Sequence, residues 1–469
     1  MSLSDFTAGD FRVLLSQISE LAVAYLGDMD SRAIQPTMSG LKVVGALQSA
    51  LPEKGLGLAA LQDLDTVIDN SRAQNGRFFG YVLGSGEPVA AAADLLASVL
   101  NQNVTAWRSG PAAATVERTV VQWLAEAIGC QEFSGSLTGG GSSANLMGLA
   151  MAREAILPAN ENGVSAQGTV YASEQVHMSI GKSVALLGLG RHNLRLVPTD
   201  AEFRMIPAEL DAAMARDRST GKRPLAVVAS AGTVNTGAID PLVEIAEIVR
   251  RHKAWLHIDG AYGALAAIAQ PEKFRGLDQA DSISLDPHKW LYQPLDCGCL
   301  LYRNPAAAQV AFSHTGDYAR ALTSDPIEGF AFFEESLELS RRFRALKLWL
   351  SLRYHGFAAF REAIEKDLRL AQRLADAIRN HPHLELEAPV ELSAVCFRYR
   401  GPAQRSAEAE NRHNEAILRR VNHRGKVYLS NATLHGRFCL RACLVNHRTT
   451  QADIDAVIPE VIAAAAKVE

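Results

Sequence analysis

Ala254-Trp255-Leu256-His257-Ile258-Asp259-Gly260-Ala261-Tyr262 is the stretch that decides the fold. It is an apolar run of strand length that ends in an acid and a glycine. A second run, Asp281–Leu285, leads into Asp286-Pro287-His288-Lys289-Trp290. Each run reads as a strand that passes into a loop, and the helical pattern Pro241–His252 precedes the first. Strands that alternate with helices are typical of a parallel sheet.

The same alternation extends in both directions along the chain. Helical patterns at Ala144–Ala155, Ile206–Ala215 and Pro241–His252 separate the apolar runs. The runs that we expect to be strands are Gly168–Tyr171, Leu194–Val197, Leu225–Ser230, Trp255–Ile258, Ser282–Leu285 and Cys299–Tyr302. Near-continuous apolar strands between helices predict an α/β fold with a mostly parallel central sheet, covered on both faces.

The pattern of helix-like and strand-like segments changes twice along the sequence, which predicts three regions. Residues 1–75 have helical periodicity and no strand pattern, which predicts an N-terminal helical segment that packs on a partner surface. Residues 76–355 hold the alternating strands and helices of a large domain. Residues 356–469 begin with a long helix, Phe360–His381, and continue with short strands and helices. This last region predicts a small C-terminal α+β domain.

The composition is that of a soluble globular protein, with 48% hydrophobic and 21% charged residues. The net charge of −4 argues against a nucleic-acid partner, which selects a basic excess. We find neither a signal peptide nor an apolar run of membrane-spanning length, so we expect no membrane partner. Six cysteines, none at a zinc spacing, suggest reduced thiols in a cytoplasm and no metal site.

Lys289 and Asp259 together give the strongest chemical signal. A lysine that holds pyridoxal phosphate covalently needs a partner acid for the pyridine nitrogen of the cofactor. Each residue follows a predicted strand, and ligands of such sheets bind where the strands end. Alone, the lysine would read as a solvated surface charge and the aspartate as a turn or helix cap. As a pair they predict a cofactor site.

A glycine-rich segment upstream, Ser136-Leu137-Thr138-Gly139-Gly140-Gly141-Ser142, predicts a site for one phosphate group. Glycines let backbone N–H groups approach an anion, and the helix N-terminus that follows favours negative charge. The alternative is a flexible turn with a serine N-cap. The segment matches neither the P-loop nor the dinucleotide fingerprint. His288 is a further candidate for the phosphate, and otherwise reads as a surface histidine.

These motifs resemble those of the group II pyridoxal-phosphate-dependent decarboxylases, the family of aromatic-L-amino-acid and glutamate decarboxylases. The similarity runs from about Asn75 to about His447 and is strongest in Ser284–Trp290. Further shared motifs are Gly139–Asn145, His257–Tyr262 and Ser340–Lys347. The resemblance implies a fold-type I enzyme, pyridoxal 5'-phosphate as the cofactor, and a homodimer with active sites at the interface.

The resemblance also implies roles for residues that would surround the cofactor. Gly141 and Ser142 match the phosphate loop of the family. Thr233 matches a threonine near the ring hydroxyl. Asp259 matches the acid at the pyridine nitrogen, and Ala261 matches a position that packs on the ring.

Three further positions match residues near the reacting end of the cofactor. Lys289 matches the Schiff-base lysine. His177 matches the histidine that stacks on the ring and helps to position the substrate; without the resemblance it would read as a helix-cap histidine. Asp286 stands where the aromatic-acid enzymes often carry asparagine, which leaves its contact with the phosphate region open.

Tyr318 is the candidate proton donor. The resemblance implies that this tyrosine protonates the substrate carbon after carbon dioxide leaves. In related aldehyde synthases phenylalanine takes its place, so a tyrosine here favours simple decarboxylation. The alternative is an ordinary tyrosine in a segment without clear periodicity.

Four positions resemble family residues that contact the substrate. Phe79 and Tyr81, in Asn75–Val82, could supply aromatic walls, although aromatic residues at this spacing are also common in protein cores. Thr105 aligns where aromatic-acid enzymes usually carry phenylalanine. Arg441 resembles an arginine that binds the substrate carboxylate in glutamate decarboxylases, or is a structural ion-pair partner.

The expected function is decarboxylation of an L-amino acid, most simply an aromatic one, to its amine and carbon dioxide. The alternatives are an acidic or other non-aromatic substrate, or another fold-type I activity such as a carbon–sulfur lyase or an aldehyde synthase. A desulfurase would need a cysteine on a mobile loop, and none lies between Cys299 and Cys396. A non-catalytic cofactor-binding protein would not need Lys289, Asp259 and Tyr318 together.

Overall fold

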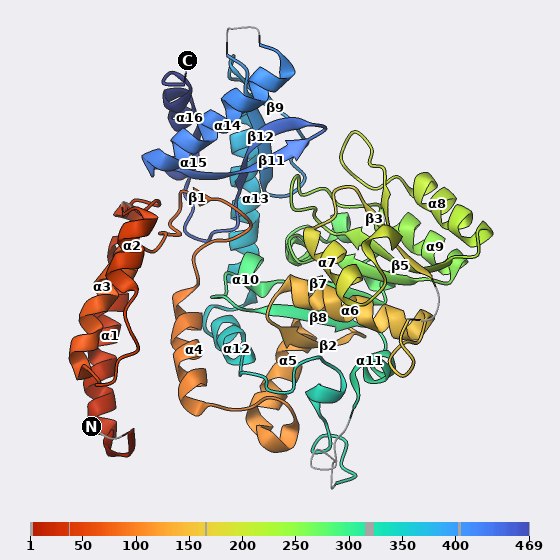
Figure 1. Cartoon of the computed structure of the whole chain (residues 1–469), viewed down its shortest axis with the longest axis horizontal. Helices are drawn as coiled ribbons and strands as arrows, with labels where there is room; N and C mark the ends of the chain where they lie inside the picture. Colours follow the sequence, from red (N-terminus) through yellow and green to blue (C-terminus); the bar gives the residue numbers. More distant parts are fainter. Residues whose placement is uncertain (1–2, 37, 165–166, 315–322, 402–404, 469) are drawn as a thin grey trace.

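The computed structural model describes residues 3–36, 38–164, 167–314, 323–401 and 405–468. Its largest element is a seven-stranded sheet with the order β2-β8-β7-β6-β5-β3-β4 (Figure 1). The strands are β2 (Ser134–Thr138), β3 (Gly168–Ser173), β4 (Leu194–Val197), β5 (Arg223–Ser230), β6 (Trp255–Asp259), β7 (Ser282–Leu285) and β8 (Gly298–Tyr302). The pairs from β7 through β4 are parallel, whereas β8 is antiparallel to both β7 and β2. The mostly parallel sheet expected from the sequence is confirmed.

Helices cover both faces of this sheet, as near-continuous apolar strands require. Successive residues of β5 show this, because Val227 and Val228 are both fully buried but belong to different hydrophobic clusters. α6, α7 and α11 pack with one cluster, and α5, α8 and α9 with the other. Their bounds are α5 (Pro111–Ala127), α6 (Gly141–Ile156), α7 (Met178–Leu186), α8 (Pro207–Ser219), α9 (Leu242–His252) and α11 (Pro305–Phe312).

The strand directions bring distant segments to one edge of the sheet. β3, β5, β6 and β7 are mutually parallel, and β2 points the same way because two antiparallel pairings separate it from β7. The segments that follow these five strands therefore meet at the carboxyl edge. Ligands of open α/β sheets bind at this edge.

The C-terminal part forms a second sheet with the order β1-β11-β12-β10-β9. Its strands are β1 (Phe78–Phe79), β9 (Leu384–Leu386), β10 (Ala394–Tyr399), β11 (Tyr428–Leu434) and β12 (Arg437–Cys443), and its helices are α13 (Phe357–Arg379), α14 (Ala407–Arg424), α15 (Gln451–Asp455) and α16 (Val457–Ala465). β1 comes from far upstream and pairs in parallel with β11. The domain boundaries at residues 75/76 and 355/356 stay a prediction.

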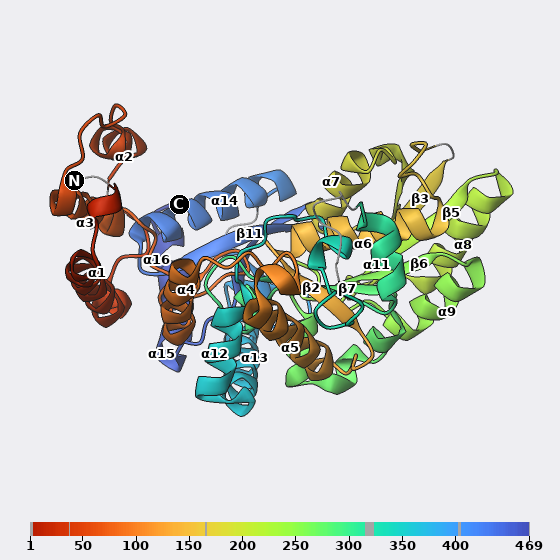
Figure 2. The same ribbon diagram turned by 90° about the horizontal axis from the view of Figure 1, so that it is seen from below.

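The N-terminal region is helical, with α1 (Ala8–Asp28), α2 (Gly40–Leu47) and α3 (Asp63–Asp69). These helices stand at one side of the molecule in both views (Figures 1 and 2). They contain no buried residue in the described part of the chain. Large apolar side chains are open to solvent there, with Leu41 87% and Leu51 92% exposed.

All six cysteines are buried free thiols. Among the described residues, no group of histidine, cysteine and acidic side chains is arranged to hold a metal ion. Within the same residues, none of the helices is both long and apolar enough to cross a membrane.

Candidate active site

A cavity of about 280 Å³ lies at the carboxyl edge of the large sheet. The segments after β2, β3, β5, β6 and β7 all contribute to its lining. Nine residues singled out from the sequence line it together: Gly141, Ser142, His177, Thr233, Asp259, Ala261, Asp286, His288 and Lys289. One cavity therefore collects residues from positions 141 to 289.

Asp259 is the last residue of β6, and its carboxylate is held from two sides. Oδ1 accepts hydrogen bonds from Ser284 Oγ at 3.1 Å and from the Ala261 backbone N–H at 3.2 Å. Oδ2 accepts one from Asn145 Nδ2 at 3.0 Å. Ser284 is placed for this contact because it is the register partner of Asp259 on β7. Three donors fix the orientation of the acid, which is 8% exposed.

Asn145 also links Asp259 to a buried polar chain beneath the cavity. Its Oδ1 accepts from His257 Nε2 at 2.9 Å. On the other side of the ring, His257 Nδ1 lies 2.8 Å from Ser282 Oγ, which accepts from Trp255 Nε1 at 2.9 Å. Burial lowers the pKa of His257 to about 4, so the imidazole is neutral near pH 7. The chain is an uncharged support for the Asp259 carboxylate.

We expect Asn145→Ala to lower the free energy of unfolding by about 1–3 kcal/mol, because it leaves the buried His257 Nε2 without a partner and removes one donor from Asp259. The measurement is denaturant unfolding of the cofactor-free protein. Asn162→Ala, at an exposed position, is the matched control and should unfold like wild type. Unfolding of Asn145→Ala at the wild-type denaturant concentration would show that the buried chain adds no stability.

Lys289 lies on the short helix α10 (Pro287–Trp290), directly after β7. Its Nζ is 2.9 Å from Asp286 Oδ2, and the side chain is 18% exposed. His288 Nε2 lies 3.6 Å from the same oxygen, and its Nδ1 donates to the Cys297 carbonyl at 2.8 Å. Burial lowers the pKa of His288. The lysine is thus held at the cavity by one carboxylate.

The glycine segment turns tightly into α6. Gly140 has a φ of +128°, a conformation that side chains other than glycine rarely adopt. A Cβ on Gly141 would come within 2.6 Å of the Ala261 Cβ, so only glycine fits there. Gly139, Gly140 and Gly141 therefore present backbone to the cavity at the start of α6, and this helix N-terminus favours an anion.

His177 and Thr233 complete the wall between the strands. His177 is the N-cap of α7, and its Nδ1 lies 2.8 Å from Ser179 Oγ. Burial is the main cause that lowers the pKa of His177, so the ring is mostly neutral near pH 7. Thr233 Oγ1 lies 2.9 Å from Thr236 Oγ1. His177 is therefore both the N-cap of α7 and a residue of the cavity wall, so the two interpretations of this histidine are compatible.

The candidate substrate residues do not line this cavity in the described chain. Phe79 is fully buried in the core of the C-terminal sheet. Tyr81 is 55% exposed and its hydroxyl lies 3.2 Å from that of Tyr428. Within one chain Phe79 packs into the core and does not form a wall of the cavity.

Thr105 and Arg441 also lie outside the cavity lining. The Thr105 carbonyl accepts from the Phe333 backbone N–H. Arg441 is 3% exposed and donates to the carbonyls of Asn235 and Tyr81 at 3.1 and 2.9 Å. Among the described residues Arg441 thus contacts backbone carbonyls and the Ser430 hydroxyl, and no ion pair of the kind suggested from the sequence is present. Tyr318 lies outside the described residues.

Two side chains that donate to Asp259, those of Asn145 and Ser284, were not assigned from the sequence. Asn145 stands within the glycine-rich motif, one turn into α6, so its place after the loop was the only signal. Ser284 precedes the lysine motif on β7, and only the pairing of β6 with β7 reveals its contact with Asp259.

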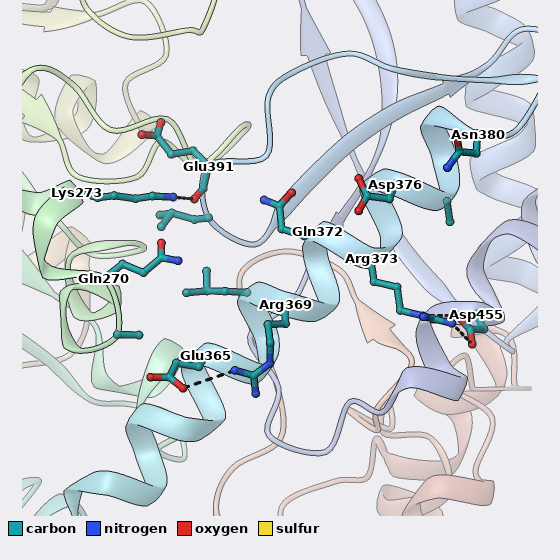
Figure 3. Close-up of a pocket in the computed structure, with 14 residues that line it drawn as sticks. Gln270, Lys273, Glu365, Arg369, Gln372, Arg373, Asp376, Asn380, Glu391 and Asp455 are labelled. Carbon is teal, nitrogen blue, oxygen red and sulfur yellow. Dashed lines mark hydrogen bonds and ion pairs between the residues drawn. The ribbon is translucent and has the colours of Figure 1, made fainter.

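A larger cavity of about 720 Å³ lies between α13 and the segment around Lys273 (Figure 3). Its charged side chains pair with one another, with the backbone or, for Asp376, with the neighbouring Arg379. Lys273 Nζ donates to the Glu391 carbonyl at 2.8 Å, and Arg373 pairs with Asp455 at 2.9 Å. It contains none of the site residues predicted from the sequence, so size alone does not mark the active site.

Comparison with known proteins agrees with this geometry. The conserved domain of the pyridoxal-dependent decarboxylases matches residues 45–400. The aromatic-L-amino-acid decarboxylase of Bacillus atrophaeus is 34% identical over 98% of this chain and 97% of its own length. The 4-hydroxyphenylacetaldehyde synthase of Rhodiola rosea is 30% identical over 94% and 93%. The solved structure of Oryza sativa TDC with PLP and tryptamine superimposes with a TM-score of 0.93, at 28% identity over 98% of both chains.

Proposed function

This chain belongs to the pyridoxal-dependent decarboxylase family and is an amino-acid decarboxylase that uses pyridoxal 5'-phosphate, and from this premise we propose that it converts an aromatic L-amino acid to its amine and carbon dioxide. One observation carries the proposal: Lys289, Asp259 and the open N-terminus of α6 line the same cavity. Aromatic substrates stand in the names of relatives such as tryptophan decarboxylase 1 of Oryza sativa, 34% identical over 78% of this chain.

The residues of the cavity fit the cofactor. Gly139, Gly140 and Gly141 line the cavity with backbone alone, so a phosphate could approach the N–H groups at the N-terminus of α6. Asp259 provides an oriented carboxylate for the pyridine nitrogen, and Lys289 provides the amine. Ser142 and His288 would contribute to the phosphate site, and Thr233 and Ala261 to the ring.

The bound cofactor would accept the electron pair of the bond between the substrate carbon and the departing carboxylate. Asp259 would keep the ring nitrogen protonated, since an opposite charge favours the ionised form of its neighbour. The three hydrogen bonds to Asp259 hold it in that orientation without neutralising it. Lys289 would hold the cofactor and release it to the substrate amine.

His177 and Tyr318 would act on the substrate side. A neutral His177 ring can lie flat on the cofactor without charge repulsion, and would fix the substrate so that its carboxylate is the group that leaves. Tyr318 would deliver a proton to the substrate carbon. We propose these roles from the family motifs and from the place of His177 in the cavity.

The substrate class is tested by measuring carbon dioxide release from a panel of amino acids with purified holoenzyme. We expect tryptophan, tyrosine, phenylalanine or a hydroxylated derivative to be turned over faster than glutamate or aspartate. Highest activity with an acidic amino acid would refute the aromatic assignment. Because an aldehyde synthase is also among the relatives, the organic product should be identified as amine or aldehyde.

We propose that the protein is a homodimer whose interface includes residues 1–75. α2 exposes Leu41, the segment between α2 and α3 exposes Leu51, and α4 (Pro88–Leu100) exposes Leu96 and Val99. Exposed apolar surface of this extent is typical of an interaction site. We expect light scattering to give the mass of two chains, and deletion of residues 1–75 to cause aggregation or loss of assembly. A truncated protein that stays monomeric and fully active would contradict the proposal.

We also propose that the enzyme works in the cytoplasm. Six buried thiols without a disulfide support a reducing compartment. Fractionation of the source cells, with the activity followed in each fraction, tests the assignment.

A further inference from the structure

Asp286 places a carboxylate beside the expected phosphate position. Its side chain is 4% exposed. A Cβ built on Gly141 would lie 2.9 Å from Asp286 Oδ2, and one built on Gly140 would lie 3.9 Å from Oδ1. The carboxylate therefore abuts the first turn of α6, the positive helix end that favours an anion.

The charge of this carboxylate is balanced in the cofactor-free chain by Lys289. Oδ2 forms the 2.9 Å ion pair with Nζ, whereas Oδ1 has no hydrogen-bond partner among the described residues although it is buried. His288 is a poor substitute for the lysine, because burial lowers its pKa and its Nε2 is 3.6 Å away. The other acid of the cavity, Asp259, already has three donors.

We propose that Asp286 weakens the hold of the site on the phosphate group, because its carboxylate repels the anion that α6 attracts. The inference rests on the proposed function, which puts the phosphate at α6. When Lys289 turns to the cofactor, Asp286 loses its close counter-charge and the repulsion increases. Phosphate and Asp286 thus compete for the same positive surroundings.

A neutral side chain of the same shape reverses the effect. Asparagine removes the negative charge, and its amide can donate a hydrogen bond to the phosphate, which a carboxylate cannot. Most substitutions in a buried site weaken binding. A gain in affinity that depends on the phosphate would therefore separate electrostatic repulsion from damage to the fold.

The test compares binding of pyridoxine 5'-phosphate and pyridoxine to the cofactor-free full chain by titration calorimetry. Neither ligand has an aldehyde, so neither reacts with Lys289, and the two differ only in the phosphate. We expect the dissociation constant of pyridoxine 5'-phosphate to be at least about tenfold lower for Asp286→Asn than for wild type. Pyridoxine should bind to both within about twofold, well inside that factor.

Two further variants separate the loss of the negative charge from the gain of a hydrogen-bond donor and from effects on the ring. Asp286→Ala removes the charge without adding a donor and should also bind pyridoxine 5'-phosphate more tightly than wild type. Asp259→Asn, the matched control, removes the other carboxylate and should weaken both ligands alike, because it acts on the ring. Equal or weaker binding of pyridoxine 5'-phosphate by Asp286→Asn, or a gain confined to asparagine, would overturn the inference. Failure of the wild-type chain to bind pyridoxal 5'-phosphate would refute the proposed function instead.

Discussion

Replacing Lys289 with alanine is expected to reduce amine formation by more than the roughly 10²–10³-fold that loss of a single preorganised donor costs. The lysine has two tasks, because it holds the cofactor and also gives way to the substrate amine. The assay is carbon dioxide release with the best amino acid from the substrate panel. Lys182→Ala is the matched control. Lys182 is an exposed lysine on α7 whose charge still reaches His177, and its loss should leave turnover near wild type.

Borohydride reduction of the holoenzyme gives an independent result. Peptide mapping should find the pyridoxyl group on Lys289. The buried Lys347 is the informative alternative, because its Nζ is already bound to Asp94 at 3.1 Å and to the Pro294 carbonyl at 2.9 Å. Label on Lys347 would overturn the assignment of the whole cavity.

Tyr318→Phe is expected to lower amine formation by about 10²–10⁴-fold, the usual contribution of a general acid. A hydroxyl can protonate the substrate carbon and a phenyl ring cannot. Binding of cofactor and substrate should persist, since the change removes one oxygen. Aldehyde and ammonia are expected in place of the amine, because molecular oxygen can oxidise the unprotonated carbon and is reduced to hydrogen peroxide, and water then hydrolyses the imine.

Product analysis of Tyr318→Phe beside wild type decides the role of this tyrosine. Protease cleavage near residue 318 should also decrease when a substrate analogue binds, if the tyrosine closes over the substrate. Amine formation at the wild-type rate by Tyr318→Phe would exclude Tyr318 as the proton donor, and would make His177 the leading candidate.

The strands of the large sheet could be predicted because burial on both faces leaves a continuous apolar signal. Leu225–Ser230 was expected and β5 spans Arg223–Ser230. The antiparallel direction of β8 could not be predicted in the same way. The connection from Asp286 to Cys297 is about a dozen residues long, near the minimum for a parallel crossover and ample for an antiparallel turn. Its length therefore permits either direction.

Some contacts within the site could be predicted from the sequence and others could not. Lys289 and Asp259 were predictable as neighbours because each follows a strand, and parallel strands end at one edge. The contact of Asp259 with Asn145 depends on the packing of α6 over β6, which local patterns do not specify. The position of Phe79 could not be predicted either. The sequence around an aromatic residue does not show whether its ring faces a ligand or packs into the core.

The pairing of β1 with β11 has a consequence for biosynthesis. Phe78 and Phe79 leave the ribosome long before their partners Tyr428 and Leu429 are made. Until then Phe79, which is fully buried in the finished protein, has no sheet to join. Pairings of such large sequence separation form slowly and leave apolar segments exposed to aggregation. The growing chain therefore carries an unpaired strand through most of its translation, and chaperone dependence should centre on this early segment.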